Sequence, residues 1–321
     1  MSVFLGIDSS NYTSSAALYH REKGIVANCK QLLPVKPGEL GLRQSDAVFH
    51  HVKNLPGVLE EALAAGREEL GAGFCLSGVG VSVRPRDAAG SYMPCFLVGE
   101  ALARSTAAVL DAPVYRFSHQ AGHIAAALYS AGRLDLLDKT FIAFHVSGGT
   151  TEAVLTRPDK ETVFHCEIVG QSLDLKAGQA IDRIGGLLGL GFPAGPALEA
   201  LAADGRSPRS VRPTLKGTDC CLSGLENQSR KLLEQGAPAA DVARFVLESV
   251  CAALDGMAAA LLERYGPLPL VFAGGVMSNR FIRGKLTEKY GAAFAQPAFS
   301  ADNAAGVALL AGEREALWHS S

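Results

Sequence analysis

The chain has 321 residues, of which 48% are hydrophobic and 19% are charged, and its formal net charge is −2. This length exceeds the usual limit of a single hydrophobic core, so we expect about two domains, and the composition excludes a disordered chain. The small net charge excludes binding to nucleic acid through a general basic field. Any RNA contact must therefore use local basic clusters or a partner.

The N-terminal residues form an apolar stretch that Asp8 interrupts. No basic region precedes this stretch, so we do not expect a signal peptide. No apolar run approaches the roughly 20 residues that a membrane span needs. The seven cysteines are odd in number and include no Cys-x-x-Cys pair, and most lie in apolar surroundings that favour buried thiols. We therefore expect a reduced, cytoplasmic protein that does not contact a membrane.

Residues 3–19 are predicted to form a β-hairpin. The apolar run Val-Phe-Leu-Gly-Ile is followed by Asp8, a turn of small polar residues and a second strand, which is the pattern of two paired strands. Helical patterns follow over residues 46–65 and 97–110.

His119 and His123 stand four residues apart at the start of a helix predicted over 120–131. This spacing places both imidazoles on one helix face, within reach of a single metal ion. A structural or merely exposed pair is the alternative, and a third ligand must come from elsewhere in the chain. We regard His145 and His165 as weaker candidates, and we expect the remaining histidines at the surface: His20, His50, His51 and His319.

Residues 141–155 repeat the hairpin plan, with Ser147, Gly148, Gly149 and Thr150 at the tip, and helical patterns follow over 174–203 and 238–265. A hairpin followed by helices, found twice, indicates an internal duplication with a ligand cleft where the two tips face each other. Glycines let the backbone approach a ligand closely, and successive N–H groups can bind an anion. A plain hairpin turn is the alternative for either tip alone.

A third glycine turn supports this interpretation. The buried-strand pattern over 270–273 is followed by Gly274 and Gly275 and then by a helix predicted over 280–290. A strand, a Gly-Gly turn and a helix start together make a common nucleotide-contact geometry. The turn lacks the G-x-G-x-x-G pattern of dinucleotide-binding proteins, so alone it is a weak signal.

Asp302 is the best candidate for the third metal ligand. It lies just before a helix predicted over 303–317, so capping of that helix is the alternative role. Two imidazoles and one carboxylate suit zinc or ferrous iron and leave positions open for substrate.

Six segments resemble motifs of the TsaD/Gcp family, the tRNA threonylcarbamoyladenosine synthases formerly classified as glycoproteases. Residues 146–151 (Val-Ser-Gly-Gly-Thr-Thr) resemble its V-S-G-G-H-T loop, and residues 118–123 (Ser-His-Gln-Ala-Gly-His) resemble its H-x-E-G-H metal motif. Residues 172–182 resemble its L-D-D-A-A-G-E-A-F-D segment. Further matches lie over 189–196, 273–280 and 301–305. The matches follow the family order along nearly the whole chain, which identifies the chain as a member of this superfamily.

The resemblance implies an α/β fold with two duplicated lobes around a nucleotide cleft, as in actin, sugar kinases and heat-shock ATPases. We expect an N-terminal lobe over 1–139 with the metal-binding histidines and a C-terminal lobe over 140–321 with the nucleotide-binding loops. The cofactors that the resemblance implies are one iron or zinc ion and ATP or an acyl-adenylate. It assigns the metal to His119, His123 and Asp302, and the nucleotide to Ser147, Gly148, Gly149, Thr150, Gly178, Asp182, Gly275 and Asn279. The candidate catalytic residues are Asp8 and Ser147.

Several positions depart from the family pattern. The family opens G-I-E-T-S-C-D-E-T, whereas Tyr12 and Thr13 here replace two carboxylates, so that only Asp8 remains of the acids. The other replacements are Ala121 for a glutamate, Thr150 for a histidine and Gln179 for a glutamate. The metal-ligand residues are kept while several acids are lost, which suggests a divergent paralogue.

Two hypotheses of function remain open. The first is a metal-dependent transferase that moves a threonylcarbamoyl or carbamoyl group from an acyl-adenylate. The family resemblance implies that the acceptor is an adenosine of tRNA. The second is a catalytically altered paralogue that binds nucleotide and acts in a complex, with a homologous dimerising protein as partner. A peptidase is disfavoured because the histidine spacing is not H-E-x-x-H. Candidate RNA contacts are three basic clusters, for which a solvated surface is the alternative: Arg84 and Arg86; Arg206, Arg209, Arg212 and Lys216; and Arg280, Arg283 and Lys285.

Overall fold

The computed structural model describes residues 2–10, 12–34, 42–300 and 304–319. The chain forms two compact units. Unit 1 comprises Met1–Lys139, Arg157–Glu167 and Phe299–Ser321, and unit 2 comprises Thr140–Thr156 and Ile168–Ala298. Two segments of the lobe expected over 140–321 thus belong to unit 1, because a long hairpin and the last helix both pack against the first part of the chain.

Unit 1 contains a five-stranded sheet in the order β3-β2-β1-β4-β5. Strands β1, β2 and β3 form an antiparallel meander, and β4 and β5 continue the sheet parallel to β1. The carboxyl ends of β1, β4 and β5 therefore lie at one edge of the sheet. The strands are β1 (Val3–Asp8), β2 (Thr13–His20), β3 (Gly24–Leu32), β4 (Leu76–Arg84) and β5 (Val114–Ser118).

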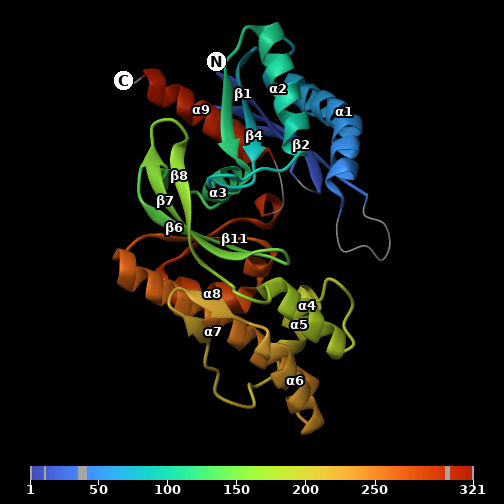
Figure 1. Ribbon diagram of the computed structural model, residues 1–321, viewed down its shortest axis with the longest axis vertical. Coiled ribbons are helices and arrows are strands. Elements are labelled where there is room, and N and C mark those ends of the chain that lie inside the picture. The colour runs from blue at the N-terminus through green and yellow to red at the C-terminus, as the bar shows by residue number, and fades with distance from the viewer. Residues whose placement is uncertain (1, 11, 35–41, 301–303, 320–321) are drawn as a thin grey trace. The chain divides into compact units, whose positions relative to one another are not determined.

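Helices cover both faces of this sheet (Figure 1). Helices α1 and α2 pack on one face and α3 and α9 on the other, and β1 and β2 are buried along their whole length because both faces are covered. The helices are α1 (Gln44–Leu70), α2 (Phe96–Leu110), α3 (His119–Ser130) and α9 (Ala305–His319).

Unit 2 contains a second five-stranded sheet, in the order β12-β11-β6-β7-β8. As in unit 1, the first strand pairs antiparallel with the second, and two later strands extend the sheet in parallel on the other side. The matching strand order confirms the internal duplication. The strands are β6 (Phe141–Val146), β7 (Thr151–Asp159), β8 (Val163–Gln171), β11 (Leu270–Ala273) and β12 (Ala293–Phe294).

The core of unit 2 lies between this sheet and its helices. Phe272 of β11 stacks between Phe144 of β6 and Phe294 of β12, with ring centroids 4.6 and 5.2 Å apart. Helix α7 is long and apolar enough to cross a membrane by length and composition, but over half of its apolar stretch is buried in this core. We interpret it as a core helix. The helices are α4 (Ala177–Leu187), α5 (Gly195–Ala202), α6 (Gly224–Glu234), α7 (Ala239–Tyr265) and α8 (Arg280–Tyr290), and a small ribbon pairs β9 (Thr214–Lys216) with β10 (Asp219–Cys221).

Two expectations about local structure were wrong. The helix predicted over 174–203 is two helices, α4 and α5, because Gly189 adopts a left-handed conformation with φ of 75° and Pro193 cannot donate to a continuing helix. His20 and His51 were expected at the surface but are buried, with 3% and 0% of their surface exposed.

Candidate functional site

The first turn of α3 is fixed at the carboxyl edge of the unit 1 sheet. Ser118, the last residue of β5, caps the helix by accepting a hydrogen bond from the backbone N–H of Ala121 at 3.1 Å. The backbone N–H of Gln120 donates to the carbonyl of Pro85 at 3.0 Å. His119 and His123 therefore lie on a helix turn that is held at both its cap and its neighbouring loop.

The two histidines lie against each other as the spacing predicted. Their ring centroids are 4.3 Å apart in an edge-to-face arrangement, and imidazole is a common ligand of zinc and iron. Asp302, the expected third ligand, lies outside the described residues. Within the described ranges, no group of three or more His, Cys, Asp or Glu residues could hold a metal. The metal site therefore stays a prediction.

Asp8 ends β1 beside the first of these histidines. The Nδ1 atom of His119 lies 3.2 Å from each carboxylate oxygen, and the Ser10 hydroxyl donates to Oδ2 at 2.6 Å. Burial favours a raised pKa for Asp8, but the charge of His119 and the hydrogen bonds from His119 and Ser10 outweigh burial and lower the pKa. The side chain is therefore a carboxylate, although none of it is exposed.

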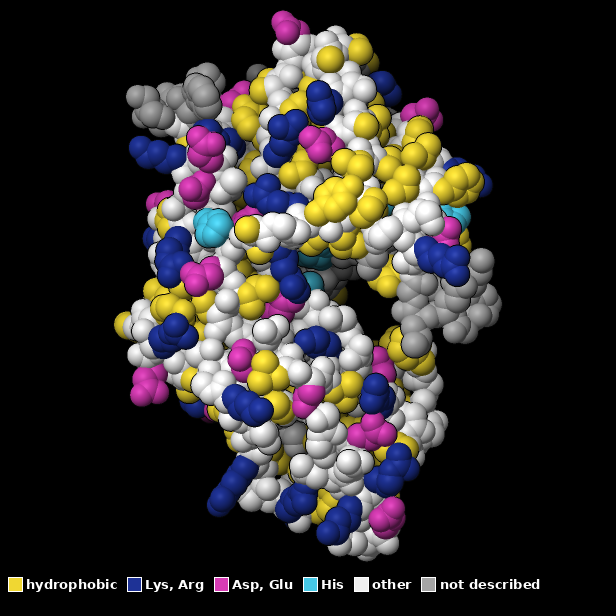
Figure 2. Space-filling view, in the orientation of Figure 1, with side chains coloured by type: hydrophobic (Ala, Val, Ile, Leu, Met, Phe, Trp, Pro, Cys, Tyr) yellow, Lys and Arg dark blue, Asp and Glu magenta, His cyan; other side chains and the backbone are white. Residues whose placement is uncertain are grey.

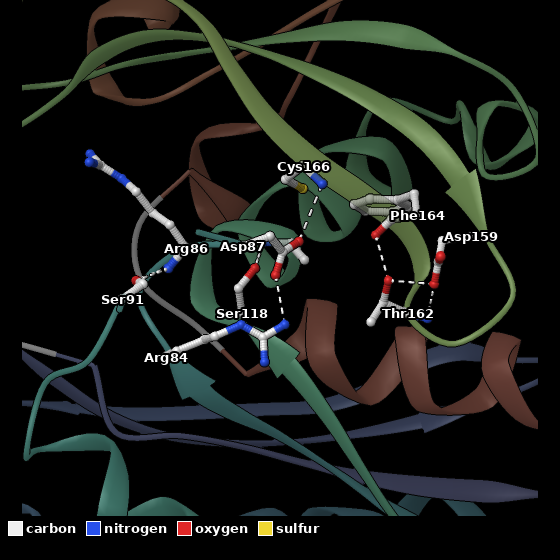
Figure 3. Close-up of polar contacts among 10 residues, drawn as sticks. Arg84, Arg86, Asp87, Ser91, Ser118, Asp159, Thr162, Phe164 and Cys166 are labelled. Carbon is white, nitrogen blue, oxygen red and sulfur yellow. Dashed lines mark hydrogen bonds and ion pairs between the residues drawn. The ribbon is translucent and has the colours of Figure 1, made fainter. Parts of the chain in front are cut away.

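The loop after β4 is held by a second buried carboxylate (Figure 3). Arg84 donates to Asp87 at 2.9 Å, and Asp87 accepts the backbone N–H of Cys166 at 3.3 Å. Burial raises the pKa of the Cys166 thiol well above its ordinary value, and the nearby Asp87 carboxylate raises it further. Arg84, an expected RNA contact, thus has part of its guanidinium engaged with its own loop.

The glycine loop of unit 2, residues 147–150, is held by hydrogen bonds between its own residues. The backbone N–H of Ser147 donates to the carbonyl of Thr150 at 2.7 Å, and the backbone N–H of Thr150 donates to the Ser147 hydroxyl at 3.1 Å. Gly178, at the start of α4, donates its N–H to the Ser147 carbonyl. A Cβ atom at Gly178 would lie 2.6 Å from the nitrogen of Gly148, so glycine is required for α4 to approach this loop.

A pocket of about 310 Å³ lies in unit 2 beside this loop. This volume is at the lower end of the range for small-ligand sites. Apolar side chains and glycines form much of its lining, and the carboxylates of Asp182 and Glu199 supply hydrogen-bond acceptors. The lining residues are Gly148, Gly178, Ile181, Asp182, Pro193, Gly195, Pro196, Glu199, Leu247, Gly275, Val276, Ser278 and Asn279.

The two glycines of the turn after β11 have different structural roles. Gly274 has a φ of 102°, and a Cβ there would collide with the carbonyl oxygen of Val146. Gly275 lines the pocket, and a Cβ there would meet nothing within 4 Å. The side chain of Asn279 caps α8 by accepting the N–H of Ile282 at 3.0 Å. Gly274 therefore packs the turn against β6, and Gly275 leaves room for a ligand.

The structure brings many of the expected ligand residues together. Gly148, Gly178, Asp182, Gly275 and Asn279 share the pocket, whereas Ser147, Gly149 and Thr150 belong to the adjoining loop and do not line it. Asp182 also accepts the backbone N–H of Ala194 at 2.8 Å, so one of its oxygens has a structural task.

Sequence reasoning missed Glu199 and Leu247 as pocket residues. Glu199 lies in α5, four residues after Gly195, and accepts the backbone N–H of Arg280 at 2.8 Å. Its position one turn after the Gly-Pro helix start was an available signal. Leu247 comes from the middle of α7, and nothing distinguishes it in sequence from the other core residues of that helix.

His51 was missed in unit 1. Its Nδ1 lies 2.8 Å from the Ser14 hydroxyl, and its Nε2 is buried without a hydrogen-bond partner. Burial lowers its pKa to about 4, although the charge of Asp8 acts in the opposite direction. His51 is therefore neutral at pH 7.

Comparison with known proteins places this geometry in a family. The model of the family described as TsaD, tRNA N6-adenosine threonylcarbamoyltransferase, matches residues 37–309. This match covers most of the chain and confirms the resemblance found in its motifs.

Solved structures of low sequence identity share the fold. Component A of (R)-2-hydroxyglutaryl-CoA dehydratase from Acidaminococcus fermentans is 19% identical with a TM-score of 0.54, and 98% of this chain and 100% of that chain are covered. Xylulose kinase from Rhodospirillum rubrum is 13% identical with a TM-score of 0.60, covering 99% and 90%. HypF from T. kodakarensis is 16% identical with a TM-score of 0.60, covering 98% of this chain but only 48% of HypF. These similarities confirm the duplicated actin-like and sugar-kinase-like fold.

Proposed function

The chain belongs to the TsaD family of tRNA N6-adenosine threonylcarbamoyltransferases, and we propose that it transfers a threonylcarbamoyl group from an acyl-adenylate to an adenosine of tRNA. The observation that carries this proposal is the unit 2 pocket, which collects family-motif residues from three separate segments: Gly148, Gly178 and Gly275. These segments are far apart in the chain, and a common binding role accounts for family-motif residues from all three lining one pocket, while packing against Gly148 accounts for the glycine at 178.

In this proposal the pocket binds the adenosine part of an adenine nucleotide. Carboxylates such as Asp182 and Glu199 accept hydrogen bonds from ribose hydroxyls, and the apolar side chains of Ile181 and Leu247 suit a base. The N–H groups of Ser147 and Thr150 are used within their own loop, so Gly148 and Gly149 would supply the backbone N–H groups for a phosphate or acyl-phosphate group. The fold relative HypF has been solved in a phosphate- and nucleotide-bound form, which supports nucleotide binding at this fold.

His119 and His123 would hold the metal, with Asp302 as the third ligand. When bound, a zinc or iron ion acts as a Lewis acid that polarises a carbonyl group. The chain's own contribution is to hold the two imidazoles in contact on the capped turn of α3.

Two kinds of partner fit this function. The proposed RNA contacts are exposed basic side chains such as Arg206, Arg212 and Arg280. Hydrophobic side chains gather on the surface over α1 and α2 (Figure 2), where Phe49 and Leu97 are among the exposed residues. An apolar patch of this kind marks a protein interface, which suits a homologous dimerising protein in the cytoplasm.

A second candidate function is supported by the turn between β1 and β2. Tyr12 and Thr13 stand where the family motif has carboxylates, and positioned acids typically contribute about 10²–10⁴-fold in rate. Their loss favours a paralogue that binds nucleotide within a complex and transfers the group slowly or not at all.

The deciding experiment supplies threonylcarbamoyl-adenylate, unmodified tRNA and the family's partner proteins, and measures the modified nucleoside by mass spectrometry. We expect the wild-type chain to form it slowly. Turnover at the rate of ordinary family members would remove the paralogue hypothesis. No turnover, with metal and nucleotide still bound, would favour the binding role.

The variant Tyr12→Asp sharpens this experiment. Tyr12 is half-buried, whereas Thr13 is only 3% exposed, so a glutamate at position 13 would place a charge in the core. We therefore expect Tyr12→Asp to raise the rate without unfolding the protein, and Tyr12→Phe, which adds no charge, to leave it unchanged.

A further inference from the structure

Asp8 and His119 are far apart in the sequence but meet at the carboxyl edge of the unit 1 sheet. Strands β1 and β5 run parallel to β4, which lies between them. Asp8 is the last residue of β1, and His119 directly follows the last residue of β5. The sheet topology therefore places the carboxylate below the first turn of α3.

We propose that Asp8 is a positioning residue, which orients His119 and fixes its tautomer so that Nε2 would carry the lone pair that binds the metal. The proposal rests on the metal site of the proposed function. It gives Asp8 a task other than the direct catalytic one expected from the sequence.

The hydrogen-bond geometry carries this assignment. A carboxylate only accepts hydrogen bonds, so the His119 nitrogen that lies 3.2 Å from both Asp8 oxygens must carry the hydrogen. That nitrogen is Nδ1, and a neutral imidazole then has its lone pair on Nε2. Metal-bound histidines usually make such a bond through their other nitrogen, which orients the ring and makes it a stronger ligand.

The surroundings of Asp8 fit an orienting role. Its side chain is 0% exposed, and the Ser10 hydroxyl holds Oδ2 at 2.6 Å. Hydrogen bonds on both sides oppose rotation of this carboxylate. The carboxylate can therefore hold the His119 ring in one orientation, as a metal ligand in the first turn of a helix requires.

The variant Asp8→Asn tests the proposal with Zn²⁺ as the probe. The amide has nearly the same shape but can donate to Nδ1, which favours the other tautomer. We expect the Kd for Zn²⁺, measured by competition with a chelator, to rise about 10–100-fold. The matched control is Glu313→Gln, which removes a carboxylate of unit 1 that accepts a hydrogen bond from Tyr19 at 3.2 Å and should leave the Kd unchanged.

A second measurement reports the His119 tautomer directly. The ¹⁵N chemical shifts of the His119 ring in metal-free wild-type protein should report hydrogen on Nδ1, and those in Asp8→Asn should shift toward hydrogen on Nε2. An unchanged Zn²⁺ affinity in a folded Asp8→Asn protein, or hydrogen on Nε2 in the wild type, would overturn the proposal. Complete loss of Zn²⁺ in both Asp8→Asn and Asp8→Glu would make Asp8 a direct ligand instead. If the wild type binds no Zn²⁺, Fe²⁺ or Co²⁺, the metal part of the proposed function fails as well, which the wild-type titration alone reveals.

Discussion

The two hairpin tips have the same place in two matching sheets but opposite chemistry. The tip after β1 begins with Asp8, which is fully buried and hydrogen-bonded on both oxygens. The tip after β6 contains Gly148 and Gly149, which are exposed and have open space where a side chain would be. Duplication thus fixed the position of both turns and left their residues to diverge. One tip supports a neighbouring histidine, and the other leaves space beside a pocket.

The largest effect is expected from removing a histidine of unit 1. In His119→Ala or His123→Ala, the affinity for Zn²⁺ should fall by more than the roughly 10–100-fold expected for a supporting residue, because a direct ligand is lost. Metal analysis of the purified variants measures this. His165→Ala removes an exposed histidine from the segment Arg157–Glu167, which is assigned to unit 1, and should keep the metal. Full Zn²⁺ affinity in either of the first two variants would remove that histidine from the site.

The corresponding variant in unit 2 places a side chain in the pocket. Gly275 is not in the left-handed region and has no neighbour within 4 Å of a Cβ, so Gly275→Leu should fold while its side chain occupies ligand space. At a ligand concentration of 100 times Kd, the wild type should gain about 2.7 kcal/mol of stability, and this variant should gain almost none. Thermal unfolding with and without ATP measures the difference.

The control for the pocket experiment is Gly284→Leu. Gly284 is an exposed glycine of α8 that also has open space, but it does not line the pocket. This variant should keep the full ATP-dependent gain. Equal gains in both leucine variants would contradict the placement of the nucleotide beside Gly275.

A smaller effect is expected from pH in unit 1. The pKa of His51 is about 4 in the folded chain and 6.5 in its ordinary state, so the unfolded chain binds more protons between these values. Stability is complete above about pH 6.5 and is lost as the pH falls toward 4, by no more than about 2 kcal/mol between pH 7 and pH 5. Denaturant unfolding at several pH values measures this loss. His51→Gln cannot titrate, so its stability should change less over the same range, and an equal change would exclude His51 as the cause.

The smallest effect is expected from Asp174 in unit 2, because this residue is exposed. Its carboxylate accepts the N–H groups of Leu175 and Leu222 at 2.6 and 2.7 Å and the hydroxyl of Ser223 at 2.6 Å. Burial acts to raise the pKa of Asp174, but these hydrogen bonds outweigh it and lower the pKa to about 2. The stability that they contribute is present above about pH 4 and is lost as the pH falls toward 2. Asp174→Asn should remove this loss of stability at acid pH, which denaturant unfolding at several pH values measures. An equal loss in the variant would exclude Asp174 as its cause.

The parts of the fold that could be predicted are those with a strong local pattern. The apolar runs of β1, β6 and β11 and the small polar residues or glycines that follow them were sufficient to predict the duplicated hairpins and the start of α8. Family motifs spread along the chain gave the two-unit arrangement. They did not predict that Arg157–Glu167 and Phe299–Ser321 pack with unit 1, because that packing depends on tertiary contacts.

His51 shows what local patterns hide. Its helix buries Ala47, His51, Leu55 and Val58, which follow the spacing of one helix face, so the histidine takes the place of an apolar residue. The spacing was visible in the sequence. The polarity of histidine suggested a surface position instead, and the Ser14 hydroxyl that makes burial tolerable comes from strand β2. Polar burial of this kind is decided by a distant partner.

The position of α9 has a consequence for how the protein is made. Helix α9 packs against β1, β4 and α3, and a Cβ atom at Gly6 or Gly306 would collide with backbone atoms across these contacts. The central strands of unit 1 therefore stay open to solvent on one face until α9 arrives. A ribosome synthesises α9 after every segment of unit 2, so unit 2 can finish folding first, although unit 1 contains the earlier sequence. A nascent chain stalled at about residue 300 would have a complete pocket in unit 2 and an open sheet in unit 1, which makes that stage of synthesis the one most exposed to aggregation.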